Sequence, residues 1–136
     1  MSNLVRCKSL NCIPEKKYHE KLFSINSSDE SLKIKDIKLT AINRYAESNI
    51  PIEYWDLKME KHFKGDARLL SKYNEYTSDI KKIYVDGISI CFAGSYGVGK
   101  TMTMCCILKK CSEKGFSTLY TSISDIVNVL LNAPND

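Results

Sequence analysis

The sequence predicts an α/β fold: an incomplete parallel sheet preceded by a small helical or irregular N-terminal segment. Three features in sequence order predict it. Residues 88–93 form an apolar, partly β-branched run, a glycine-bearing loop follows at once, and a helical pattern comes after the loop. A second strand-like run and a second helical pattern follow. Strand, loop, helix, strand and helix in this order are the start of a parallel α/β sheet.

The N-terminal segment is predicted to extend over residues 1–48, and the sheet-bearing domain over residues 49–136. Within the first, residues 15–23 can form a helix, and a serine-rich stretch at 24–29 interrupts it. Apolar residues then recur over 31–47, where we favour a helix over a strand. Pro51 breaks any helix and holds the residue before it in an extended conformation.

The second domain shows a sharper periodicity. Five apolar or aromatic side chains follow one another at steps of four, three, four and three residues, which is one face of an amphipathic helix over 66–86. Gly87 is predicted to end this helix. The five side chains are those of Leu69, Tyr73, Tyr76, Ile80 and Ile83.

Two strands and two further helices complete the expected order. The strand over 88–93 resembles a buried parallel strand, and a helix over 100–114 ends at Gly115. Residues 117–121 are predicted to form the second strand. Ser122 and Asp125 then resemble a capping box that opens a helix reaching Leu131.

Composition indicates a globular protein. Of the 136 residues, 43% are hydrophobic and 26% are charged, which is ordinary for a folded domain. No apolar run approaches the roughly 20 residues that span a bilayer, and no secretory signal is visible. We therefore expect a cytoplasmic protein without a membrane partner. The net charge of +4 is concentrated in residues 1–48, with nine Lys and Arg against six Asp and Glu.

The six cysteines do not resemble a disulfide framework. Cys91 lies in the strand-like run, and Cys105, Cys106 and Cys111 lie in the helical pattern that follows the loop. Such positions suit a reduced cysteine that acts as a small buried hydrophobic residue, and a cytosolic setting keeps thiols reduced.

The loop itself matches the phosphate-binding pattern G-x-x-x-x-G-K-[ST] at every fixed position, from Gly94 to Thr101. Glycines allow a tight turn whose N–H groups converge on phosphate, and the following helix directs its positive end at the same anion. Lys100 would contact the β- and γ-phosphates, and the Thr101 hydroxyl would bind Mg²⁺. ATP and Mg²⁺ are the expected ligands. The predicted nucleotide-binding residues are Gly94, Ser95, Tyr96, Gly97, Val98, Gly99, Lys100, Thr101 and Met102.

Hydrolysis requires more than this loop. An acidic residue on a later strand holds the metal and positions water, and an arginine usually stabilises the transition state. The acids after the second predicted strand are Asp125, expected at a helix start, and Asp136. We therefore expect the first part of an ATPase domain, one that binds nucleotide without efficient turnover by itself; its catalytic residues are left unassigned.

Several segments together resemble the IstB/DnaC-like ATPases, AAA+ proteins that include replicative helicase loaders and transposition helpers. The resemblance covers about residues 45–131. It implies an ATPase that acts on DNA or on a helicase ring and binds ATP between subunits of an oligomer. It also implies an acidic motif, sensor residues and an arginine finger, none of which maps onto this sequence. The segments are 49–55 (NIPIEYW), 63–66 (FKGD), 90–94 with the loop, and 119–125 (LYTSISD).

Three functions follow as hypotheses. The leading one is ATP-dependent loading of a replicative helicase in DNA replication. The second is a transposition helper that binds DNA and a transposase. The third is a truncated, non-catalytic nucleotide-binding fragment. The partners expected are thus ATP, a helicase or transposase, and single-stranded DNA, with homo-oligomers for the full-length protein.

Weaker patterns carry alternatives. Cys7, Cys12 and His19 could provide three zinc ligands, but their spacing is unusual and no fourth ligand is evident, so free thiols are favoured. Tyr54 and Trp55 could stack on adenine or on a single-stranded base; a hydrophobic anchor is the favoured interpretation. His62 has no discernible partner in the sequence pattern.

Overall fold

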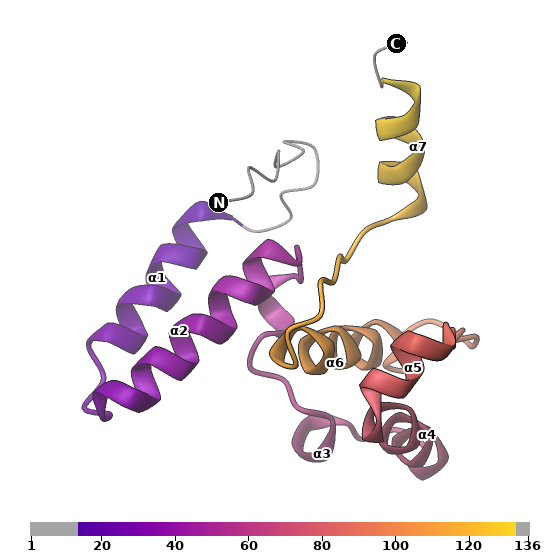
Figure 1. Ribbon diagram of the computed structural model, residues 1–136, viewed down its shortest axis with the longest axis horizontal. Helices are drawn as coiled ribbons and strands as arrows, with labels where there is room; N and C mark the ends of the chain where they lie inside the picture. The colour runs from indigo at the N-terminus through magenta and orange to yellow at the C-terminus, as the bar shows by residue number, and fades with distance from the viewer. Residues whose placement is uncertain (1–13, 133–136) are drawn as a thin grey trace. The chain divides into compact units, whose positions relative to one another are not determined.

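A computed structural model describes residues 14–132, and these residues form helices joined by turns and extended segments (Figure 1). No strand occurs among them, so the predicted α/β parallel sheet is wrong. The helices are α1 (Glu15–Asn26), α2 (Leu32–Glu47), the 3-10 helix η2 (Ile52–Tyr54), α3 (Met59–His62), α4 (Ala67–Ser78), α5 (Ile80–Asp86), α6 (Lys100–Glu113) and α7 (Ile123–Leu131).

The chain divides into two compact units. One comprises Met1–Ile52 together with Leu119–Asp136, and the other comprises Glu53–Thr118. The predicted phosphate-binding loop therefore lies wholly within the second unit.

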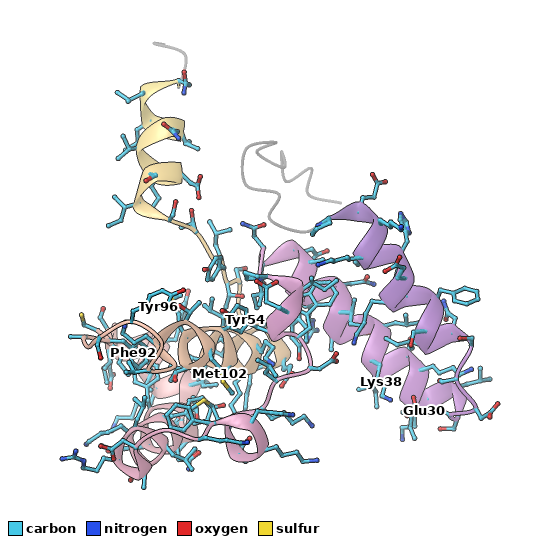
Figure 2. The ribbon with its side chains drawn as sticks, turned by 180° about the vertical axis from the view of Figure 1, so that it is seen from behind. Glu30, Lys38, Tyr54, Phe92, Tyr96 and Met102 are labelled. Atoms are coloured by element: carbon cyan, nitrogen blue, oxygen red, sulfur yellow. The ribbon has the colours of Figure 1, made fainter. Side chains whose placement is uncertain are left out.

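The first unit contains a hairpin in which α1 and α2 lie side by side (Figure 1). Ile25, Ile42 and Tyr45 are its buried side chains. Glu30 and Lys38 form an ion pair near the turn, where Figure 2 labels them. Both predicted helices are confirmed, although α1 continues three residues past its predicted end, to Asn26.

The second unit packs α3 and α4 against α6. Its core cluster consists of buried residues from these three helices, and partly buried side chains from the same helices and from the segments beside them pack against it. The buried members are Met59, Tyr73, Cys106 and Ile107, and the partly buried ones include Phe63, Phe92 and Met102. The core thus adjoins the first turn of α6, the helix that follows the loop.

The single helix predicted over 66–86 is in fact two, α4 and α5, and Asp79 separates them. Asp79 has φ −133° and ψ 76°, and its carboxylate accepts a hydrogen bond of 3.0 Å from the N–H of Lys82. Short polar side chains compete with helical hydrogen bonds in this way. The predicted apolar face is nevertheless confirmed, because Tyr73 and Ile80 are buried.

Residues 88–93 do not form the predicted buried strand. The segment has no regular secondary structure, and Ile88 and Ile90 are 47% and 38% exposed. The apolar pattern alone does not make a strand, because a strand requires a neighbouring strand and the described residues supply none.

Residues 117–121 fail as a strand for a visible reason. The N–H of Tyr120 donates to the carbonyl of Ser48 at 2.8 Å, and the Asn49 side-chain amide donates to the carbonyl of Tyr120 at 3.1 Å. The turn after α2 therefore takes both backbone groups of Tyr120, near the end of the predicted strand. The capping box of α7 is confirmed: Ser122 and Asp125 bond each other's backbone N–H groups.

Cys105 and Cys106 are buried as predicted, but Cys91 is exposed, so its expected burial in a strand is wrong. Among residues 14–132, no helix is long and apolar enough to cross a membrane.

Candidate nucleotide-binding loop

The loop between residues 94 and 101 depends on glycine for its backbone shape. Gly97 has φ 81° and Gly99 has φ 93°, values in the left-handed region that other residues rarely adopt. Around Gly97 the space is open, so backbone conformation alone requires glycine there. At Gly99 packing adds a second requirement, because a Cβ would lie 2.9 Å from Cε2 of Phe63. The third glycine of the motif is therefore fixed by both conformation and packing.

Lys100 is folded back over the loop. Its Nζ donates to the carbonyl of Gly94 at 2.9 Å and to that of Ser95 at 2.7 Å. Both acceptors are neutral, and within residues 14–132 no ion pair involves this ammonium. The loop thus holds a full positive charge beside its own backbone without neutralising it.

Helix α6 begins at Lys100, as predicted, directly after the loop. Gly99 is its N-cap and offers no side chain to bond the first N–H groups of the helix. Thr103 is fully buried, and its hydroxyl donates to the carbonyl of Gly99 at 2.9 Å. This bond fastens the first turn of α6 to the end of the loop. An uncapped helix N-terminus next to a lysine ammonium is an arrangement that attracts anions.

The remaining predicted ligands differ in their placement. Tyr96 is fully exposed at the loop tip, and Val98 and Thr101 are exposed as well. Met102 is partly buried, and its side chain packs against the core cluster; Figure 2 labels it with Phe92 and Tyr96 in the loop region. The structure therefore places Lys100 over the loop backbone and leaves Thr101 exposed, whereas the Met102 side chain packs against the core cluster.

Sequence reasoning missed Lys109. This residue is buried, and its Nζ donates to the carbonyls of Tyr54 at 2.7 Å and Trp55 at 3.1 Å, and also to that of Leu57. Desolvation is the main influence on Lys109 and lowers its pKa. One signal was available: Lys109 lies four residues after Cys105, on the same face of α6, among residues that are apolar or small.

Lys109 thereby attaches the turn around Trp55 to the helix that begins at the loop. Trp55 is buried, which agrees with the hydrophobic anchor that we favoured. Tyr54 is half-buried, and its pKa is raised, first by burial and then by Cys105, Glu53 and Tyr96.

The zinc hypothesis cannot be followed through the structure, because Cys7 and Cys12 lie outside the described residues. His19 is exposed on α1, and its Nε2 lies 3.7 Å from a carboxylate oxygen of Glu15. Within the part of the chain that the structure describes, no cluster of three His, Cys, Asp or Glu residues could hold a metal ion. His62 does have a partner, contrary to expectation: its Nδ1 accepts a hydrogen bond of 2.9 Å from the N–H of Lys58.

Comparisons of the chain with protein-family models, with curated proteins and with solved structures find no match. The resemblance to IstB/DnaC-like ATPases therefore rests on the residues quoted for it.

Proposed function

We propose that this chain binds ATP together with Mg²⁺ through the loop from Gly94 to Thr101. The observation that carries the proposal is the position of the Lys100 ammonium, held over the loop by two carbonyls at the uncapped start of α6. Phosphate oxygens are stronger acceptors than neutral carbonyls. A bound triphosphate would therefore take over the ammonium from Gly94 and Ser95 without a large movement of the lysine.

Each part of the loop has a separate task in this proposal. The backbone at Gly97 and Gly99 adopts left-handed conformations, which allow successive N–H groups to converge on phosphate. Lys100 neutralises charge on the β- and γ-phosphates, and the exposed Thr101 hydroxyl completes the shell of Mg²⁺. The first turn of α6 adds the positive end of its dipole.

We further propose that the nucleotide serves a cytoplasmic protein of the helicase-loader type in DNA replication. Two of the segments that carry the resemblance are the residues around Trp55 and the loop. Lys109 connects them, because it lies on α6, the helix that begins at the loop, and donates to the carbonyls of Tyr54 and Trp55. This link supports a common function for the two segments. The proposal concerns the loop and its helix, and no parallel sheet is part of it.

A titration with a fluorescent ATP analogue in the presence of Mg²⁺ tests nucleotide binding. Lys100→Ala removes a charge-assisted contact worth about 1.5–3 kcal/mol, so affinity should fall roughly ten- to hundredfold. Lys114→Ala is the matched control, because Lys114 is an exposed residue just after α6 and lies outside the loop. Equal affinities of wild type and Lys100→Ala would disprove the proposal.

A further inference from the structure

The three glycines of the loop differ in what surrounds them. A Cβ added to Gly94 would meet Val98, a residue of the loop itself, and one added to Gly97 would meet no atom within 4 Å. One added to Gly99 would lie 2.9 Å from Cε2 and 3.4 Å from Cδ2 of Phe63. Gly99 is therefore the loop glycine that is in contact with a side chain from another part of the second unit.

Phe63 is held in place on its other sides. Its side chain is partly buried and packs against the core cluster, and its N–H donates to the carbonyl of Met59 at 3.2 Å, where α3 ends. The ring also covers Gly65, because a Cβ there would lie 3.0 Å from both Cε1 and Cε2. Non-bonded carbon atoms normally stay about 3.5–4.0 Å apart. The ring thus fills the space between Gly65 and Gly99, and its Cε2 atom reaches both.

Gly99 is the residue at which the loop passes into α6. It has φ 93° and is the N-cap of the helix, and its carbonyl accepts from the N–H and from the hydroxyl of Thr103, each at 2.9 Å. The N–H groups of Lys100 and Thr101 follow directly, and the first N–H groups of a helix have no partner within it. The conformation of Gly99 therefore sets the direction in which these donors point.

We propose that Phe63 is a positioning residue for phosphate: through Gly99 it holds the first N–H groups of α6 in the arrangement that receives the phosphates of the nucleotide. The inference rests on the proposed nucleotide site and adds to it an apolar residue from outside the loop. Without the ring, Gly99 can adopt the many conformations that glycine permits. Phosphate must then order the loop as it binds, and that ordering lowers the affinity.

The first experiment compares Phe63→Leu with Leu70→Ala in the full chain. Both substitutions shorten an apolar side chain that packs against the core cluster, but Leu70 lies on α4 and an added Cβ at Gly99 would not meet it. Chemical denaturation gives the stability of each variant, and circular dichroism gives the conditions in which both are folded. There, Phe63→Leu should bind the fluorescent ATP analogue about tenfold more weakly than the parent, and Leu70→Ala should bind within about twofold of it.

Phe63→Met is a second variant without the ring and should show the same loss of affinity as Phe63→Leu. Unchanged affinity in the two variants at Phe63 would overturn the proposal. An equal loss in Leu70→Ala would overturn it as well, because Phe63 would then act through the stability of the core alone.

Tripolyphosphate with Mg²⁺, which has neither base nor ribose, shows which part of the nucleotide Phe63 serves. In competition with the fluorescent analogue, its affinity for Phe63→Leu should also be about tenfold lower than for the parent. A loss confined to the nucleotide would mean that the ring serves the base or the ribose, and the proposal would be wrong.

Lys100→Ala separates this inference from the proposed function. If Lys100→Ala binds as the parent does, the ATP site itself is disproved; if it binds weakly while Phe63→Leu binds normally, the role of Phe63 alone is disproved. Chymotrypsin adds a test without nucleotide, because Tyr96 is fully exposed at the loop tip. Cleavage after Tyr96 should be about fivefold faster in Phe63→Leu than in Leu70→Ala, and equal rates would contradict the hold of the ring on the loop.

Discussion

The ring of Phe63 lies against the backbone of Gly99, so close that a Cβ on Gly99 would be 2.9 Å from Cε2 of the ring. The same ring also covers Gly65, where an added Cβ would collide with it. One aromatic side chain after α3 thus packs on the end of the phosphate-binding loop, and this contact links the loop to the core cluster of the second unit.

Gly99→Ala should destabilise the protein by two separable effects. The left-handed backbone costs a non-glycine residue about 1–2 kcal/mol, and forced overpacking against Phe63 adds about 1–3 kcal/mol. Gly97→Ala is the control, because its φ is 81° but no atom lies within 4 Å of the added Cβ. Chemical denaturation of both variants should show the larger loss for Gly99→Ala.

The contribution of the ring can be isolated with Phe63→Ala. In the double variant Phe63→Ala, Gly99→Ala the clash is gone, so its loss of stability should be smaller than the sum of the single losses by about 1–3 kcal/mol. If the losses of the two single variants simply add in the double variant, the contact between the ring and the loop does not contribute to the free energy of unfolding.

Thr101→Ala should weaken ATP binding about tenfold when Mg²⁺ is present and leave it unchanged in excess chelator, because the hydroxyl binds the metal and not the phosphate. Thr101→Ser, which keeps the hydroxyl, is the matched control and should bind as the parent does. The measurement is the fluorescent-nucleotide titration in the two conditions. The same loss of affinity with and without metal would assign the hydroxyl a different role.

Lys109→Met should lower the free energy of unfolding by at least about 2 kcal/mol. The substitution keeps an apolar stem but leaves the carbonyls of Tyr54 and Trp55 without this donor, and an unsatisfied buried acceptor costs about 1–3 kcal/mol. Lys110→Met is the neighbouring control. Lys110 makes a partly exposed ion pair of 3.5 Å with Glu60, of a kind worth about 0–1 kcal/mol. Losses of equal size would contradict the structural role assigned to Lys109.

Alkaline pH should destabilise the protein partly through Cys105. Burial raises the pKa of this thiol from 9.0 to about 12, so above pH 9 the unfolded chain loses a proton that the folded chain keeps. Stability from this group is complete below pH 9 and decreases as pH rises toward 12, by up to about 1.4 kcal/mol per pH unit. In Cys105→Ala, denaturation midpoints should fall less steeply between pH 9 and 10. An unchanged slope would mean that Cys105 does not contribute.

Local features of the fold could be predicted from sequence. The start of α6 at Lys100, the capping box at Ser122 and the stop at Gly87 each depend on residues a few positions apart, and the structure has all three. The break at Asp79 was predictable in principle, because aspartate is a preferred N-cap. It was missed because the apolar periodicity runs through it.

Non-local features could not be predicted in this way. An apolar, partly β-branched run over residues 88–93 suggests a strand but not its partner, and the partner decides whether a sheet exists. The hydrogen bonds of Tyr120 with Ser48 and Asn49 join positions about seventy residues apart. A pattern within a few neighbouring residues cannot predict bonds over that distance. At the candidate site, the loop motif identified Lys100 and Thr101, whereas Lys109 is visible only once the turn at Trp55 is placed beside α6.

The bond between Lys109 and Leu57 spans 52 positions of the chain, and the entire phosphate-binding loop lies inside that span. Closing so long a loop costs roughly 3–4 kcal/mol of chain entropy, a cost met once when the unit folds. A protease that cuts the exposed tip at Tyr96 would therefore sever the polypeptide between two points that the fold holds together. The two fragments should elute as one particle and separate only in denaturant, so that a nicked molecule keeps its core while its loop loses covalent continuity.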